Sequence, residues 1–247
     1  MAPGIGTSPD PAALGGAVDA APPPDDRFAA RLRGFGPLGL LAAAAILLTG
    51  NVFFADMFVV PVGAPLVLLW AWRSRTPWRE IGLARPDNWA LTVASGLVFG
   101  IALKFAMKAV VMPLLGADPV NQAFRFLTGN TAMLPVATWG MFVAGFGEET
   151  VFRGFLFERL SKLLGTGAAA TVVIVLITSA WFGLAHYGFQ GVAGVQQATI
   201  VGLFFGGIFA LTGRLWMLMI AHTAFDLTAL AMIYLNLETA VARLVFR

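Results

Sequence analysis

The chain has 247 residues, of which 58% are hydrophobic and only 12% charged, with a formal net charge of +3 and no cysteine. Soluble domains carry about 25% charged residues, so a water-soluble fold could not bury this much apolar surface, and the composition indicates a membrane protein. The lack of cysteine excludes disulfides, thiolate metal ligands, a cysteine nucleophile and prenylation of the chain, and the small positive charge does not indicate nucleic-acid binding.

Residues 1–26 form a first segment that is rich in Ala, Pro, Gly and Asp. This composition predicts a disordered tail, because it offers little apolar surface to bury. The segment lacks a basic start followed by an apolar core, so it is not expected to be a signal peptide. Residues 27–247 are then expected to form one transmembrane domain.

Seven apolar segments follow, most of them close to the roughly 20 residues that a spanning helix needs. They cover residues 35–52, 56–72, 89–115, 132–157, 168–188, 195–213 and 215–236. The sequence therefore predicts an all-α, polytopic transmembrane bundle of about seven spans. Six or eight crossings stay open as alternatives, because a re-entrant segment would reverse every later one.

Basic residues are concentrated in alternate connections between these segments. If all seven cross, one side carries Arg27, Arg31, Arg33, Arg73, Arg75, Arg79, Arg85, Arg159, Lys162 and Arg214. The opposite side carries mainly Arg125, Arg243 and Arg247. By the positive-inside rule the N-terminus is expected in the cytoplasm.

Charged and titratable residues also occur within or beside the apolar segments, where each charge costs about 2.5–3.5 kcal/mol on insertion scales. They must therefore face one another or a wet cavity; they are Lys104, Lys108, Glu148, Glu149, Arg153, His186, His222 and Asp226. A single such histidine would most simply bond between helices. The chain's two histidines, two glutamates and one aspartate on three spans resemble a gathered site.

The two lysines share a face of the third span and are most simply interpreted as snorkelling to an interface. Binding of a substrate carboxylate or of lipid headgroups by Lys104 and Lys108 is the alternative.

Helix spacing assigns roles to the acidic residues. Glu148 and Glu149 point about 100° apart, whereas Glu149 and Arg153 share a face and can pair. This pairing would leave Glu148 to a separate task, although both carboxylates could instead serve Arg153. His222 and Asp226 also share a face, so they could bind one metal, or Asp226 could fix the tautomer of His222.

Two chemistries fit these residues, and both hydrolyse an amide. Glu148, His186, His222 and Asp226 are candidate ligands of a zinc ion, which would lower the pKa of a bound water. Without metal, Glu148 could accept the proton of a water that His186 holds, with His222 and Asp226 stabilising the oxyanion. Phe182, one turn before His186, is interpreted as packing that shields the histidine.

Three motifs resemble those of the CAAX protease and bacteriocin-processing (CPBP) intramembrane peptidases. Residues 148–153, EETVFR, resemble the EExxxR motif; residues 182–186, FGLAH, the FxxxH motif; and residues 222–226, HTAFD, the HxxxN or HxxxD motif. Their order and their placement on successive spans also agree. The resemblance covers roughly residues 36–236.

The resemblance implies a helical membrane bundle with a conical polar cavity open to the cytosolic side. It implies an endopeptidase acting on a membrane-associated peptide or protein, and a bacterial inner-membrane location. It assigns water activation to Glu148 with His186, the scissile carbonyl to His222 with Asp226, and a supporting role to Glu149 with Arg153. Asp226 departs from the Asn of eukaryotic members. Because an ionised Asp would repel an oxyanion, Asp226 is expected to be protonated, turned towards His222 or bound to metal, and the departure favours metal modestly.

Two rival functions are a catalytically silent scaffold and a proton-coupled transporter. No motif residue is lost, which disfavours a silent scaffold. The chain also lacks the internal repeat that many transporters show. The substrate, its prenylation and the oligomeric state do not follow from the sequence.

Overall fold

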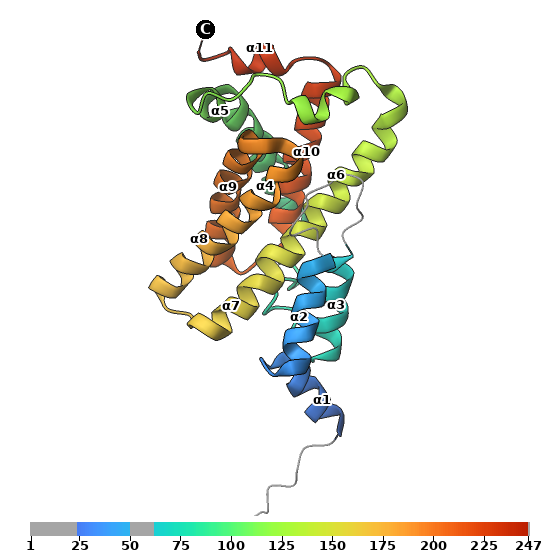
Figure 1. Cartoon of the computed structure of the whole chain (residues 1–247), viewed down its shortest axis with the longest axis vertical. Coiled ribbons are helices and arrows are strands. Elements are labelled where there is room, and N and C mark those ends of the chain that lie inside the picture. Colours follow the sequence, from blue (N-terminus) through green and yellow to red (C-terminus); the bar gives the residue numbers. More distant parts are fainter. Residues whose placement is uncertain (1–23, 50–61, 247) are drawn as a thin grey trace, which may run out of the picture.

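The computed structural model describes residues 24–49 and 62–246, and within these ranges it contains helices and turns but no strand (Figure 1). The all-α prediction is therefore confirmed. Helix boundaries follow local chemistry: the Asn88 side chain caps α4 (Trp89–Ala106) by accepting from the Leu91 N–H at 2.9 Å. Gly213, with a φ of 61°, ends α9 (Tyr187–Thr212) in the left-handed conformation that glycine adopts readily.

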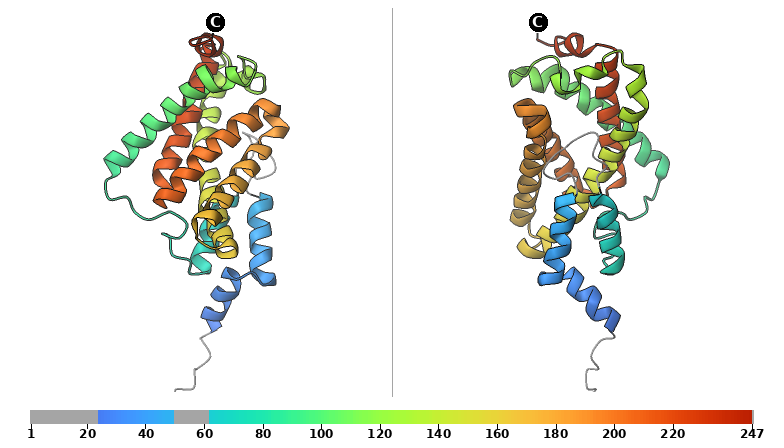
Figure 2. Two further views of the ribbon diagram at one scale, coloured as in Figure 1. Left: turned by 90° about the vertical axis from the view of Figure 1, so that its left-hand side faces the viewer. Right: turned by 45° about the vertical axis from the view of Figure 1, so that its right-hand side comes forward.

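The N-terminal part consists of α1 (Pro24–Arg33), α2 (Pro37–Thr49) and α3 (Gly63–Arg73), with α2 and α3 side by side (Figures 1 and 2). Helix α1 begins at Pro24, so the prediction of disorder is wrong for residues 24–26. Proline is favoured at the first helical position, and the acidic pair that follows it complements the helix dipole. Residues 1–23, the rest of the predicted tail, lie outside the described residues, as do residues 50–61 between the first two predicted spans.

Helix α4 packs along α10 (Trp216–Tyr234). It continues through the π-helical turn η2 (Met107–Val111) into α5 (Met112–Leu114). A Cβ atom at Gly100 would lie 2.1 Å from the Ala221 carbonyl oxygen, so only glycine permits this approach. The pair brings the third and seventh predicted spans into direct contact.

A long helix crosses the bundle as α6 (Leu134–Glu149), the π-helical segment η5 (Thr150–Leu156) and α7 (Phe157–Leu164) (Figure 1). Helices α8 (Ala168–Ala185) and α9 follow as an adjacent pair. The short helices η3 (Gln122–Leu127), η4 (Thr131–Met133) and α11 (Glu238–Ala242) lie at the end of the molecule opposite α1.

Within residues 24–49 and 62–246, four helical stretches are long and apolar enough to cross a membrane: Trp89–Leu114, Ala168–Ala185, Tyr187–Thr212 and Trp216–Tyr234. A fifth would be the bent pair Asp26–Arg33 and Pro37–Thr49, whose axes differ by 58°. Large apolar side chains on the spans point outward, such as Val98 at 69% and Leu211 at 89% exposure, as expected for a lipid-facing surface. The chain is a multi-pass membrane protein, and seven crossings stay a prediction.

The connections that carry most of the basic residues gather at the α1 end (Figure 2). Glu80 pairs there with Arg33 and, at 3.7 Å, with Lys162, and so joins three segments distant in sequence. Partial burial raises the pKa of Glu80, but the hydrogen bond and charge of Arg33, with Lys162 and Arg79, bring it below its ordinary value. The predicted clustering of basic residues on one side is thus present.

Candidate active site

Helices α6 and α10 approach each other closely at the centre of the candidate site. A Cβ atom at Gly145 would lie 2.3 Å from Thr223 Oγ1, so a larger residue would force the helices apart. Glu148 lies three residues after this glycine, and His222 immediately precedes the threonine. The close contact therefore brings the first and third motifs together.

Glu149 contacts two of the other buried titratable side chains, Arg153 and His222. Its Oε1 accepts from Arg153 Nη1 at 2.8 Å, and the two side chains are 0% and 1% exposed, which confirms the predicted ion pair. The same oxygen lies 2.8 Å from His222 Nδ1. Because an ionised carboxylate only accepts, we assign the proton of this bond to His222 Nδ1. Sequence reasoning did not find this second bond, which joins helices 73 positions apart.

Glu148 and Asp226 both face the other nitrogen of the same imidazole. Glu148 Oε2 lies 3.7 Å and Asp226 Oδ2 3.6 Å from His222 Nε2. These distances are too long for direct hydrogen bonds and suit a bridging water molecule. Arg153 forms its ion pair with Glu149, so the alternative in which both glutamates pair with the arginine is not what the structure contains. The sequence had suggested that Asp226 could fix the tautomer of His222. In the structure Glu149 makes the hydrogen bond that fixes it.

His186 lies at the junction of α8 and α9 and is half-buried. Its Nδ1 is 2.8 Å from the Phe182 carbonyl oxygen, so Nδ1 carries the proton and Nε2 is the free acceptor. The Phe182 ring packs edge-on against His186 and His222, with ring centroids 4.7 and 5.9 Å apart. The predicted packing role of Phe182 is confirmed and extends to both histidines.

A second aromatic ring completes the surroundings of Arg153. The guanidinium lies 4.7 Å from the Phe182 centroid and 5.6 Å from that of Phe205, which also packs against His222 at 5.6 Å. These rings favour the cation while excluding water. Phe205 was not predicted, because one phenylalanine within a Phe-rich apolar span carries no signal in sequence.

The described residues contain no group of three or more His, Asp or Glu side chains placed to hold a metal ion. This geometry gives no support to zinc binding by Glu148, His186, His222 and Asp226, which stays a prediction. Two buried atoms of the site, Glu149 Oε2 and Arg153 Nε, have no hydrogen-bond partner among the described residues.

The two lysines of the third span are buried, at 6% exposure for Lys104 and 8% for Lys108, so the snorkelling interpretation is wrong. Lys108 Nζ pairs with Glu238 of α11 at 2.7 Å. Lys104 Nζ donates to Gln197 Oε1 at 3.2 Å and lies 4.6 Å from the centroid of the Phe225 ring. Both ammonium groups point into the protein because polar partners from other helices meet them there.

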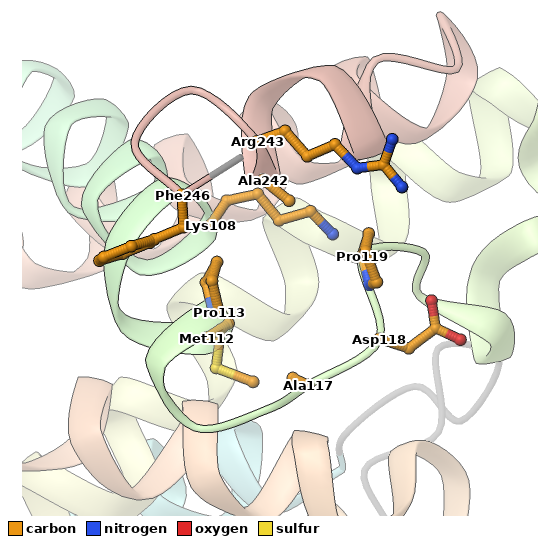
Figure 3. Close-up of a pocket in the computed structure, with 9 residues that line it drawn as sticks. All are labelled: Lys108, Met112, Pro113, Ala117, Asp118, Pro119, Ala242, Arg243 and Phe246. Atoms are coloured by element: carbon orange, nitrogen blue, oxygen red, sulfur yellow. The ribbon is translucent and has the colours of Figure 1, made fainter.

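Two cavities lie at the α11 end. One of about 240 Å³ is lined by both lysines and by residues of α9, α10 and the 117–123 connection. A second, of about 220 Å³, is drawn in Figure 3 and is lined by Lys108, Met112, Pro113, Ala117, Asp118, Pro119, Ala242, Arg243 and Phe246. Both lie away from the basic α1 end, so the expected opening of a polar cavity to the cytosolic side is not confirmed.

Comparison with known families agrees with the motifs. Residues 129–228 match the family model described as Type II CAAX prenyl endopeptidase Rce1-like, and this range contains all three motifs. The predicted resemblance to the CPBP intramembrane peptidases is thereby confirmed. Searches of curated proteins and of solved structures find no match.

Proposed function

We propose that this chain, whose residues 129–228 match a CAAX-type peptidase family, is an intramembrane endopeptidase that cleaves a membrane-associated peptide or protein. The observation that carries the proposal is the approach of Glu148 and Asp226 to one nitrogen of His222, at 3.7 and 3.6 Å. Three titratable groups at distances that suit one bridging water molecule support a hydrolytic role for this site. A prenylated substrate is not required by this arrangement.

In the proposed reaction Glu148 acts as general base. It removes a proton from a water molecule, whose oxygen attacks the scissile carbonyl carbon. The carbon–nitrogen bond then breaks, and Glu148 returns the proton to the leaving amine. His186, whose Nε2 is free because Nδ1 is engaged by the Phe182 carbonyl, would orient the water.

His222 would stabilise the oxyanion with a proton on Nε2. Glu149, bonded to Nδ1 at 2.8 Å, favours the imidazolium form that this role needs, much as a carboxylate supports a catalytic histidine in serine proteases. Asp226, whose Oδ2 lies 3.6 Å from the same Nε2, would stabilise the positive charge of His222 electrostatically without a direct hydrogen bond. This arrangement answers the objection that an ionised Asp226 would repel the oxyanion directly.

Three further assignments stay proposals. Zinc assistance has no support from the donor geometry and would be tested by metal analysis of the purified chain. An N-terminus in the cytoplasm follows from the basic α1 end and the positive-inside rule. A bacterial inner membrane and about seven spans follow from the family resemblance and from the apolar segments.

The direct test is Glu148→Gln in the purified full chain, assayed with a library of labelled peptides in lipid nanodiscs. Loss of the base is expected to reduce kcat about a hundredfold to ten-thousandfold. Glu80→Gln is the matched control, because it makes the same change far from the site and should keep full activity. Equal cleavage by wild type and Glu148→Gln would refute the assignment.

A further inference from the structure

Lys104 and Lys108 differ in their partners although they lie one turn apart on the same helix. Lys108 is neutralised by Glu238 at 2.7 Å. Among the described residues, no carboxylate lies within ion-pair distance of Lys104, which meets only an amide oxygen and an aromatic ring. An ammonium group at 6% exposure thus lacks a direct ion-pair partner, and Asp226 and Glu238 act on it only from beyond ion-pair distance.

A buried charge without a counter-charge is costly, and the amide and the ring offset only part of that cost. The Gln197 carbonyl oxygen accepts a single hydrogen bond from an ammonium group that has three to donate. Among the described residues, Lys104 therefore retains two donors without a hydrogen-bond partner and a charge without a direct ion pair. A negatively charged ligand would accept hydrogen bonds from these donors and would balance the charge of Lys104.

Lys104 lines the cavity of about 240 Å³, and this cavity begins one helical turn beyond the candidate site. Gln190, on its wall, donates its backbone N–H to the His186 carbonyl oxygen at 3.0 Å. Ala229, which also lines the cavity, follows Asp226 by three residues on α10. Asp226 also interacts electrostatically with Lys104, so the lysine and the site are neighbours.

We propose that Lys104 determines specificity by binding a carboxylate of the peptide substrate within this cavity. The inference rests on the proposed peptidase function. A peptide that extends from the scissile bond past His186 or Asp226 enters the cavity within a few residues, because an extended chain advances about 3.3 Å per residue. The carboxylate is either the peptide's C-terminus or an acidic side chain near the cleaved bond.

Lys108 does not share this role, because its charge is already balanced. Glu238 also accepts from the Asn121 backbone N–H at 3.1 Å, so the Lys108–Glu238 pair ties α11 and the 117–123 connection into the cavity wall. Lys108 is therefore a matched control: a buried lysine of the same helix and cavity whose ammonium group has a protein counter-charge.

The experiment compares peptides that differ only in a C-terminal carboxylate or carboxamide, with and without an internal Glu. Wild type is expected to prefer one carboxylate-bearing form about tenfold to a hundredfold in kcat/KM, the range of a charge-assisted hydrogen bond. Lys104→Met should abolish the preference, whereas Lys108→Met should retain it. Which peptide is preferred identifies the C-terminus or the side chain as the source.

Binding to the full-length Glu148→Gln variant, measured with the same peptides by fluorescence anisotropy, separates this inference from the proposed function. The inference is supported, even if no peptide is cleaved, when the Glu148→Gln variant binds carboxylate-bearing peptides selectively and the additional change Lys104→Met abolishes this selectivity. Cleavage without any carboxylate preference, or a preference that survives in Lys104→Met, overturns the inference and leaves the peptidase function standing. An equal loss for all peptides in Lys104→Met would show a structural role and would also overturn it.

Discussion

Glu149 and Glu80 each pair with two cationic or ionisable partners, and the surroundings of the two carboxylates differ. Glu149 meets Arg153 and His222 with side chains that are at most 6% exposed. Glu80 meets Arg33 and Lys162 at the α1 end, with side chains that are 30–35% exposed. In the first cluster burial makes every missing partner costly, whereas in the second water replaces a lost partner. A carboxylate with two partners thus positions the side chains of the candidate site at Glu149, whereas at Glu80 it joins segments that are distant in sequence.

Arg153→Met is the substitution with the largest expected effect, and it tests whether burial makes the loss of a charged partner costly at Glu149. Removing the guanidinium leaves Glu149 buried without its ion-pair partner, which is expected to lower the free energy of unfolding by about 3–5 kcal/mol. Reversible unfolding in mixed micelles measures the change, with Arg33→Met as the control in the exposed cluster. A loss below about 1 kcal/mol in Arg153→Met would show that burial does not separate the two clusters as described.

Glu238→Gln is expected to have an intermediate effect on the free energy of unfolding. The Lys108–Glu238 pair is buried, but each of the two charged groups forms only this one ion pair among the described residues. The amide keeps a hydrogen bond and removes the charge, so the free energy of unfolding should fall by about 1–3 kcal/mol. The double variant with Lys108→Met should be more stable than the sum of the two single changes predicts. Strict additivity in this cycle would contradict a direct pair.

The smallest effect is expected from Glu80→Gln, at most about 1 kcal/mol near neutral pH, because the cluster is solvent-exposed and screened by salt. The pKa of Glu80 lies below its ordinary value of 4.5, so its ionised form is stabilised by folding. This contribution is present above 4.5 and is lost as the pH falls through the lower pKa of the folded state. Wild type and Glu80→Gln should therefore converge in stability under acidic conditions, and a difference that grows on acidification would contradict the assignment.

Sequence reasoning succeeded where residues interact within one helix. The Glu149–Arg153 pair, the contact between Phe182 and His186, and the all-α architecture follow from spacing and apolar length. The start of α1 at Pro24 was not predicted, because residues 1–26 were expected to form a disordered tail, although Pro24 and the following acidic pair are typical of a helix N-terminus.

Contacts between helices were not predictable in the same way. The Glu149–His222 bond and the Lys108–Glu238 pair join residues 73 and 130 positions apart. Helical periodicity indicates which side chains share a face, but it does not indicate which helix that face meets. The motifs gave the identities of the site residues, whereas the Gly145 approach that brings α6 and α10 together emerged only from the structure.

The π-helical segment η5 has a consequence for how the two clusters are related. Glu149 precedes this segment and Lys162 follows it on α7, so one uninterrupted helix carries members of both clusters. A π-helical bulge corresponds to one inserted residue, and each residue of an ordinary helix turns the chain by about 100°. The angle between the candidate site and the Glu80 cluster therefore depends on one additional residue. Deleting one residue among 154–156, which follow the EETVFR motif, would turn Lys162 away from Glu80 while every motif remained intact.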